Sequence, residues 1–166
     1  PSEKCNNQAF VDIALRLEHA GILVPEIIAK DLTRGFLCLS DLGDCLLAQL
    51  LTDNSVQEYY RQAIALLPNV AKISTKNLPD YDRAFIQTEL AIFPEWLLNQ
   101  HLAIELTSDQ QTQLQQCFDY LIENALQQPQ VFMHRDFHSR NIMQVADKLA
   151  LIDFQDAVKG PISYDI

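Results

Sequence analysis

The sequence predicts an α+β fold in which a helix and a β-hairpin precede a long helical region and a small β region. Apolar residues recur at helical spacing over residues 8–20, and two strand-length apolar segments follow. Helical periodicity then runs from residue 45 to residue 128, whereas residues 131–153 hold three short apolar runs of strand length. The segment "HRDFHSRN" lies between the first two of these runs, so the densest polar cluster of the chain falls in the β region.

Composition and charge narrow the class of protein. The 166 residues are 48% hydrophobic and 20% charged, which is typical of one globular domain. A net charge of −10 argues against a nucleic-acid partner, because binding a polyanion relies on positive charge. The four cysteines form no C-x-x-C pair, and neither a signal-peptide pattern nor an apolar run of membrane-spanning length occurs. We therefore expect a cytoplasmic protein with free thiols and no membrane partner.

The first elements are a helix and a hairpin. Residues 8–20 form the expected helix, and Gly21 supplies a helix stop. Segments 25–31 and 35–41 have the composition of two strands joined by a short turn. The motif "DLGD" at 41–44 then breaks the pattern, so we expect a change of architecture there.

The middle of the chain carries helix start and stop signals. Ser55 and Glu58 have capping-box spacing at the head of "SVQEYYRQAIALL". Pro68 should end or kink this helix, and Pro94 should do the same to "YDRAFIQTELAIF".

The last helix and the β region follow. Thr107 or Ser108 can cap a long helix that Pro129 terminates. Beyond it, "VFMH", "NIMQV" and "LALID" are the expected strands, with "ADK" as the turn between the second and the third.

One interpretation of the polar cluster is a metal site of the zinc type. His134, Asp136 and His138 alternate, and alternate residues of an extended segment face the same side. A zinc site needs three or four ligands, and the other histidines, His19 and His101, lie in helical segments without a motif. A metallohydrolase is therefore the weaker interpretation.

A second interpretation is a phosphotransferase loop. Asp136 and Asn141 have the H-x-D-x-x-x-x-N spacing of a catalytic loop, and Asp153 follows the apolar run "LALI" at an expected strand end. Magnesium prefers hard oxygen ligands and few protein groups. Asn141 and Asp153 supply such oxygens, which leaves Asp136 to receive or orient a hydroxyl group. We expect His134 to shape the loop, and Arg135 and Arg140 to be surface charges.

The motifs also carry a family resemblance. "HRDFHSRN", "LIDFQDA" and "GPISYD" resemble the aminoglycoside phosphotransferase and choline kinase-like superfamily. Within it, these motifs together with "FLCLSDLGD" and "LAIFPEWLL" resemble the bacterial anomeric N-acetylmuramate/N-acetylglucosamine kinases. The resemblance implies phosphorylation of a small molecule, most closely an amino sugar in cell-wall recycling. Aminoglycoside, choline or other small-alcohol kinases, and a non-catalytic kinase-like binding module, are the alternatives.

The resemblance implies a protein kinase-like fold with ATP and Mg²⁺ as cofactors. Residues 1–40 would be part of an N-terminal nucleotide-binding lobe, and residues 41–166 a C-terminal catalytic lobe. In this fold Asp136 is the expected catalytic base, while Asn141 and Asp153 are the expected metal ligands.

The resemblance also assigns the nucleotide slot and its support. The backbone of Ser40 and Leu42 would face adenine, with Met143 and Ile152 lining the other side of the slot. Asp165 would brace the catalytic loop without touching the substrate.

Two further loop residues are candidates for phosphate or substrate contacts. His138 stands two residues after the expected base, where protein kinases often carry a phosphate-contacting lysine. Arg140 could pair with the lactyl carboxylate of a muramate.

Some expected parts are missing from the sequence. A kinase of this type has a glycine-rich loop and a strand lysine over the phosphates, yet only seven residues precede the helix at 8–20. Asp12 and Glu18 are weak candidates for the acidic partner of that lysine. We therefore expect the 166-residue chain to be a fragment, truncated at its C-terminal end as well, and to be inactive alone.

Overall fold

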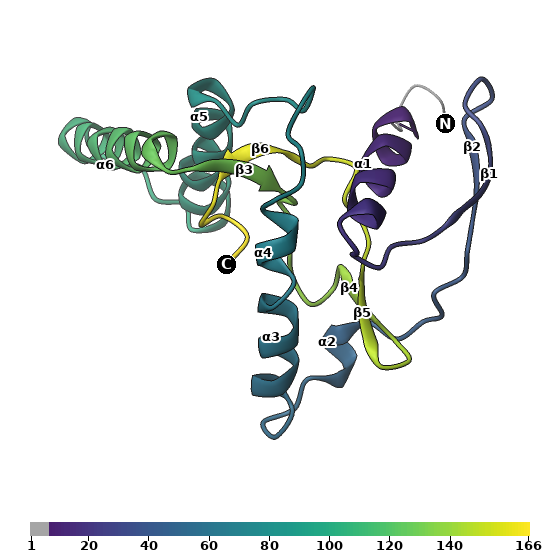
Figure 1. Ribbon diagram of the computed structural model, residues 1–166. Helices are drawn as coiled ribbons and strands as arrows, with labels where there is room; N and C mark the ends of the chain where they lie inside the picture. Colours follow the sequence, from purple (N-terminus) through teal and green to yellow (C-terminus); the bar gives the residue numbers. More distant parts are fainter. Residues whose placement is uncertain (1–6) are drawn as a thin grey trace.

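The computed structural model describes residues 7–166 of the chain and has the predicted α+β architecture (Figure 1). The helical elements are α1 Asn7–His19, α2 Leu47–Leu50, α3 Val56–Ile64, α4 Leu67–Val70, α5 Arg83–Ile92, the π-helical segment η1 Phe93–His101, and α6 Ser108–Gln127. The strands are β1 Ile27–Asp31, β2 Phe36–Leu39, β3 Gln130–Met133, β4 Ile142–Val145, β5 Lys148–Leu151 and β6 Val158–Pro161. They pair in the described region as three antiparallel two-stranded sheets, β1–β2, β3–β6 and β4–β5. Figure 1 shows α5 and α6 at one end, the β1–β2 hairpin at the other, and the two smaller sheets between them.

Helix α1 and its stop are confirmed. The buried side chains of α1 recur at helical spacing and include Ile13 and Leu17. Gly21 follows in the left-handed region with φ 75°, a conformation that favours glycine. The N–H of Ile22 donates to the carbonyl of Leu17 at 3.0 Å, which is the long bond of a Schellman motif.

The predicted hairpin forms between β1 and β2, with Asp31 opposite Phe36 at its closed end. Its base is tied to the core, because the chain just before β1 runs beside β5. The N–H of Leu151 donates to the Leu23 carbonyl at 2.9 Å, and Leu23 bridges Ala150 in parallel.

The predicted capping box at Ser55 and Glu58 does not form, so this prediction is wrong. Ser55 precedes α3, but its side chain does not cap the helix. Its hydroxyl instead donates to the Leu50 carbonyl at 2.7 Å and accepts from the Thr52 N–H at 2.9 Å. Glu58 pairs with Arg61 one turn further along α3. A local loop arrangement therefore competes with the cap for the serine hydroxyl.

The other capping motif forms at Thr107. Its hydroxyl accepts from the Gln110 N–H at 3.3 Å, and the Gln110 side chain accepts from the Thr107 N–H at 2.9 Å. Helix α6 runs on from there and ends before Pro129, as expected. Pro68 and Pro94 both stand in the first turn of a new helical segment, α4 and η1 respectively. The preceding helices end just before them, so each proline coincides with a predicted break.

The C-terminal β region contains the three expected strands and one that the sequence did not indicate. Strands β4 and β5 form a hairpin through the predicted "ADK" turn, whereas β3 pairs with the additional strand β6. Strand β6 reads "VKGP", a composition that disfavours a strand. Close packing explains its glycine, because a Cβ on Gly160 would lie 2.5 Å from the sulfur of Met133.

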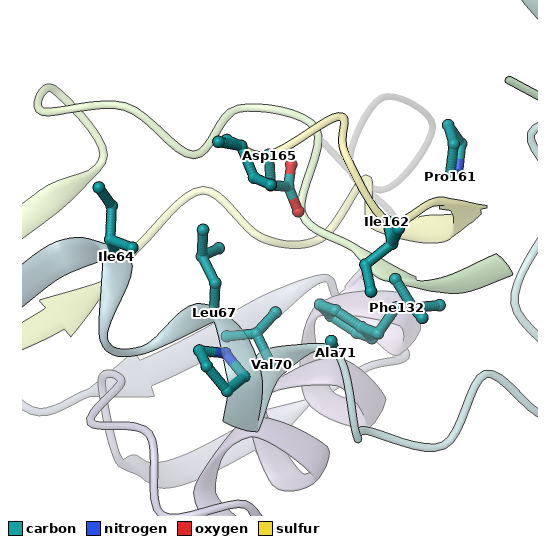
Figure 2. A pocket seen from close by; sticks show the side chains of 11 residues that line it. Ile64, Leu67, Val70, Ala71, Phe132, Pro161, Ile162 and Asp165 are labelled. Atoms are coloured by element: carbon teal, nitrogen blue, oxygen red, sulfur yellow. The ribbon is translucent and has the colours of Figure 1, made fainter. Parts of the chain in front are cut away.

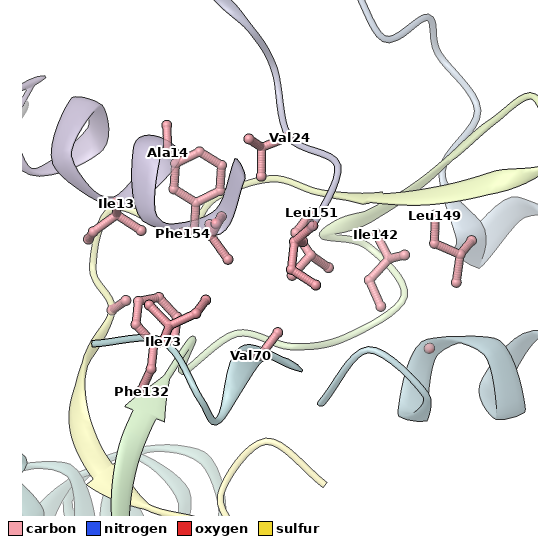
Figure 3. Close-up of a cluster of buried hydrophobic side chains, with 14 of the residues drawn as sticks. Ile13, Ala14, Val24, Val70, Ile73, Phe132, Ile142, Leu149, Leu151 and Phe154 are labelled. Carbon is pink, nitrogen blue, oxygen red and sulfur yellow. The ribbon is translucent and has the colours of Figure 1, made fainter. Parts of the chain in front are cut away.

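Two hydrophobic clusters hold these elements together. In Figure 3, Ile13 and Ala14 of α1, Phe154, and the strand residues Ile142 and Leu151 line one side of the larger cluster. The smaller cluster joins α5 and α6 to the β3–β6 sheet through Ile86, Ile122, Met133 and Val158. The β3–β6 sheet contributes to both clusters, so it links α5 and α6 to the rest of the molecule. None of the helices within residues 7–166 is long and apolar enough to cross a bilayer.

Candidate active site

The polar cluster lies in the loop between β3 and β4, and the strands place its ends. Strand β3 ends at Met133 and leads directly into His134, while Asn141 stands just before β4. Strand β5 pairs with β4 so that Leu151 lies opposite Ile142, and Asp153 follows two residues later. The antiparallel pairing therefore carries Asp153 back to the end of the loop.

Asn141 connects the two aspartates of the proposed catalytic set. Its side-chain amide donates to the Asp136 carbonyl at 3.2 Å and lies 3.5 Å from an Asp153 carboxylate oxygen. The backbone carbonyl of Asn141 accepts a hydrogen bond from the N–H of Ile152 at 3.0 Å, which fixes the Asn141 backbone to the segment after β5. The structure thus brings together Asp136, Asn141 and Asp153, which are separated by up to 17 positions in the sequence.

Asp153 has an unusual backbone conformation. Its φ is 61°, in the left-handed region that few non-glycine residues adopt. Such conformations concentrate at functional sites. The carboxylate is exposed, and the Gln155 side chain donates to one of its oxygens at 2.8 Å. The Asn141 amide nitrogen is the atom that lies toward this carboxylate, while the carboxylate and the side-chain oxygen of Asn141 are hard oxygens of the kind that Mg²⁺ prefers.

The loop itself is a series of tight turns. The N–H of His138 donates to the Asp136 carbonyl at 3.0 Å, and the N–H of Asn141 donates to the His138 carbonyl at 2.8 Å. Asp136, His138 and Arg140 all have exposed side chains on this loop. The expected base and the two candidate contact residues are thus open to a ligand from solvent.

Asp165 lies beneath the start of the loop. Its two carboxylate oxygens accept from the backbone N–H groups of His134 at 2.7 Å and Arg135 at 3.0 Å. Figure 2 shows Asp165 at the edge of an apolar cavity of about 370 Å³, near Phe132 and Ile162. Burial raises the pKa of the Asp165 carboxyl, and the two amide hydrogen bonds offset part of that rise.

We expect Asp165→Asn to destabilise the fold by about 1–3 kcal/mol, the cost of leaving a buried donor unsatisfied. An asparagine offers one acceptor oxygen to two loop N–H groups, so one of them faces another donor. Removing the charge of the half-buried Asp165 carboxylate recovers only part of this cost. Urea denaturation should show the change, and Asp147→Asn, in the exposed turn between β4 and β5, should leave the midpoint unchanged. Equal midpoints for both variants would contradict a bracing role for Asp165.

His134 is fully buried, with its ring 6.2 Å from that of Phe137 in an edge-on arrangement. Neither ring nitrogen has a hydrogen-bond partner among residues 7–166. Burial is the main cause of the lowered pKa of His134, which favours a neutral imidazole. A buried neutral ring at this position suits a residue that shapes the loop and is unsuited to contact with a substrate.

The residues assigned to the nucleotide slot lie on two elements that meet. The backbone N–H of Ser40 donates to the Glu26 carbonyl at 2.9 Å, which anchors the segment after β2. That segment then runs beside β4, where Leu46 bridges Met143. Leu42 lies between these two anchor points. Ile152 is half-buried just after β5, the partner of β4.

The zinc-type interpretation finds no geometric support. No group of three or more His, Cys, Asp or Glu side chains within residues 7–166 is arranged to hold a metal ion. The segment with His134, Asp136 and His138 is also a turning loop, so the expected alternation of an extended strand does not apply.

Arg135 was expected to be a surface charge, and this is wrong. Its side chain is 24% exposed, and its guanidinium donates to Glu89 of α5 at 2.7 Å. Glu89 lies 46 positions earlier in the chain and outside every motif, so spacing could not have indicated it. Arg140, in contrast, is exposed as expected.

The kinase-like loop spacing, the adjoining carboxylate and amide groups and the α+β architecture are those expected of the kinase-like class of phosphotransferase folds. The chain belongs to the phosphotransferase enzyme family, whose model matches residues 4–166. The predicted resemblance is thereby confirmed at the family level.

Curated relatives carry a more specific name. The chain is 40% identical over 167 residues to an N-acetylmuramate/N-acetylglucosamine kinase of Pseudomonas aeruginosa, covering 100% of this chain and 49% of the relative. It is 37% identical over 148 residues to the protein of the same name from Neisseria meningitidis, covering 86% of this chain and 44% of the relative. The chain therefore spans about half the length of the curated relatives it matches.

Solved structures confirm the fold. An ADP-bound aminoglycoside phosphotransferase matches with a TM-score of 0.63 at 13% identity, over 96% of this chain and 57% of that one. An ethanolamine kinase of Plasmodium vivax matches with a TM-score of 0.58 at 17% identity, over 98% of this chain and 50% of that one. The kinase-like fold is thus shared with proteins of distant sequence.

Proposed function

We propose that the complete gene product is a cytoplasmic ATP- and Mg²⁺-dependent kinase that phosphorylates the anomeric hydroxyl of N-acetylmuramate or N-acetylglucosamine. The observation that carries this proposal is the contact of one side chain, Asn141, with both Asp136 and Asp153. It is the arrangement expected when one aspartate serves the acceptor and the other serves the metal. The names of the curated relatives support the choice of an amino sugar.

Asp136 is the proposed catalytic base. Its carboxylate is exposed on a loop whose turns are fixed by hydrogen bonds, so it can meet a sugar hydroxyl held above it. An anomeric hydroxyl is more acidic than an ordinary alcohol, and modest help in removing its proton suffices. Most of the rate gain then comes from positioning and from neutralising the phosphate charge.

Asn141 and Asp153 are the proposed Mg²⁺ ligands. Asn141 is fixed at its amide nitrogen by the Asp136 carbonyl, and its amide oxygen is the group proposed to face the metal. Gln155 holds one oxygen of Asp153, which orients the carboxylate. When bound with the nucleotide, Mg²⁺ supplies positive charge that screens the phosphates.

The nucleotide would bind between the two proposed lobes, residues 1–40 and residues 41–166. Backbone groups of Ser40 and Leu42 would meet the adenine edge, and Met143 and Ile152 its face. Support for this comes from the Leu46–Met143 bridge, which holds the connecting segment against β4.

The exposed side chains of His138 and Arg140 are proposed to contact the ligands beyond Asp136. His138 is assigned to the transferred phosphoryl group. Arg140 is assigned to the lactyl carboxylate of a muramate, because an arginine binds a carboxylate through two parallel hydrogen bonds.

A panel of acceptors tests the substrate. We expect the complete gene product to convert N-acetylmuramate and N-acetylglucosamine to 1-phosphates in the presence of ATP and Mg²⁺, with the phosphate position assigned by ³¹P NMR. The 1-O-methyl glycosides are matched controls, since they lack the anomeric hydroxyl and should not react. Turnover only on aminoglycosides, choline or ethanolamine would reject the amino-sugar assignment and leave the family unchanged.

A further inference from the structure

Arg135, the residue before the proposed base, is held from two directions. Its backbone is left-handed with φ 78°, and its N–H donates to Asp165 at 3.0 Å. Its guanidinium reaches helix α5 and donates to Glu89 at 2.7 Å. The conformation of the loop just ahead of Asp136 therefore depends on a main-chain anchor and a side-chain anchor.

Glu89 is the centre of a polar cluster that also includes two tyrosines. One of its oxygens accepts from Arg135, while the other accepts from the hydroxyls of Tyr81 and, at 3.4 Å, Tyr164. Burial, reinforced by the hydrogen bond to Glu89, raises the pKa of Tyr81, so this hydroxyl stays a donor at neutral pH. Tyr164 directly precedes Asp165, which binds the backbone of His134 and Arg135. The cluster is therefore connected to the loop through Tyr164 and Asp165 as well as through Arg135.

The Arg135–Glu89 pair differs from the surface ion pairs of this protein. Its side chains are 24% and 25% exposed, whereas those of the Arg83–Glu123 pair are 44% and 55% exposed. The Arg135 guanidinium also lies 4.9 Å from the centre of the Phe85 ring. Exposed pairs contribute little to stability, but removing one partner of a partly buried pair leaves a charge without compensation.

We propose that Glu89 is a positioning residue for Asp136, an inference that rests on the proposed function. Arg135 directly precedes Asp136 in the chain, and the charges of both Glu89 and Asp136 attract its guanidinium, which the structure shows bound to Glu89. While Glu89 binds the guanidinium, Asp136 remains free for the acceptor hydroxyl. Without the charge of Glu89, Arg135 turns to Asp136, occupies the base and pulls the loop out of place.

The variant Glu89→Gln in the complete gene product tests this inference. The amide keeps the size and an acceptor oxygen for the tyrosines but removes the charge. We expect kcat to fall about tenfold to a hundredfold, since misplacing a catalytic group by ~1 Å costs on the order of a hundredfold. The KM values for sugar and ATP should stay within about threefold, because neither ligand touches Glu89. Glu123→Gln, which removes the exposed pair with Arg83, is the matched control and should leave kcat unchanged.

The double variant Glu89→Gln/Arg135→Met separates positioning from simple destabilisation. It removes the cation that would otherwise capture Asp136, so its kcat should exceed that of Glu89→Gln, a non-additive effect expected of coupled residues. A double variant as slow as, or slower than, Glu89→Gln would overturn the capture of Asp136 by Arg135. An unchanged kcat in Glu89→Gln would overturn the inference as a whole.

Amide hydrogen exchange over residues 130–141 provides a readout that needs no activity. We expect faster exchange in Glu89→Gln than in wild type, and no difference in Glu123→Gln. If the wild-type protein transfers no phosphoryl group at all, the proposed function fails, and the exchange comparison alone decides whether Glu89 positions the loop. Equal exchange in all three proteins would then reject that role.

Discussion

Replacing Asp136 with asparagine in the complete gene product should lower kcat by two to four orders of magnitude while ATP still binds. Losing a positioned general base typically costs about 10²–10⁴-fold. The asparagine fits the same loop, because the hydrogen bonds that hold this position within residues 7–166 involve the Asp136 backbone carbonyl and not its side chain. The loss should therefore appear in the chemical step and leave the fold intact.

Single-turnover rates with saturating ATP, beside nucleotide titrations, measure this prediction. Asp156→Asn is the matched control, because it removes an exposed carboxylate close to the site that has no assigned role. It should leave turnover within about threefold of wild type, as for a surface substitution away from the chemistry. Turnover of Asp136→Asn near the wild-type rate would remove Asp136 from the role of base.

The elements that the sequence predicted well are those with strong local signals. Helix α1 combines helical periodicity with a glycine stop, and the structure realises both at Leu17 and Gly21. Strand β6 had no such signal, since "VKGP" contains two residues that disfavour strands. It forms because β3 offers a partner and because Gly160 allows the close approach of Met133. Tertiary contact decides this strand, and local propensity does not.

The two capping motifs show the limit of spacing as a signal. Thr107 and Gln110 form the reciprocal bonds of a capping box, whereas Ser55 and Glu58, at the same spacing, do not. The difference lies outside the motif, because the Ser55 hydroxyl is already engaged with the preceding loop through Leu50.

The candidate site likewise contains residues that the sequence predicted and residues that it did not. Asp136, Asn141 and Asp153 were predictable, because the loop spacing and a strand end place them, and the structure brings them into contact. The ion pair of Arg135 with Glu89 was not predictable, because it joins a loop to a distant helix face. The residues of a catalytic loop can thus be predicted from one sequence segment, whereas the contacts that hold the loop in place depend on the tertiary structure.

Replacing Asp153 should remove Mg²⁺-dependent nucleotide binding. Mutating a residue that only orients a metal ligand typically lowers metal affinity by about 10–100-fold. Removing a direct ligand should therefore lower it by at least on the order of 100-fold. Asn141 alone then remains of the two proposed ligands, and a neutral amide compensates little of the metal charge. We expect ATP affinity measured with Mg²⁺ to fall to the level measured with EDTA.

The backbone of Asp153 determines which variants isolate this effect. Its φ of 61° is tolerated by asparagine, whereas alanine adds strain of about 1–2 kcal/mol in the left-handed region. Asp153→Asn should therefore keep the thermal midpoint near that of wild type, and Asp153→Ala should lower it; both should lose the Mg²⁺ dependence of ATP binding. Asp147→Asn removes an exposed carboxylate from the β4–β5 turn and should retain that dependence. Calorimetric titration with and without Mg²⁺ distinguishes these outcomes, and a wild-type metal response in Asp153→Asn would withdraw Asp153 as a ligand.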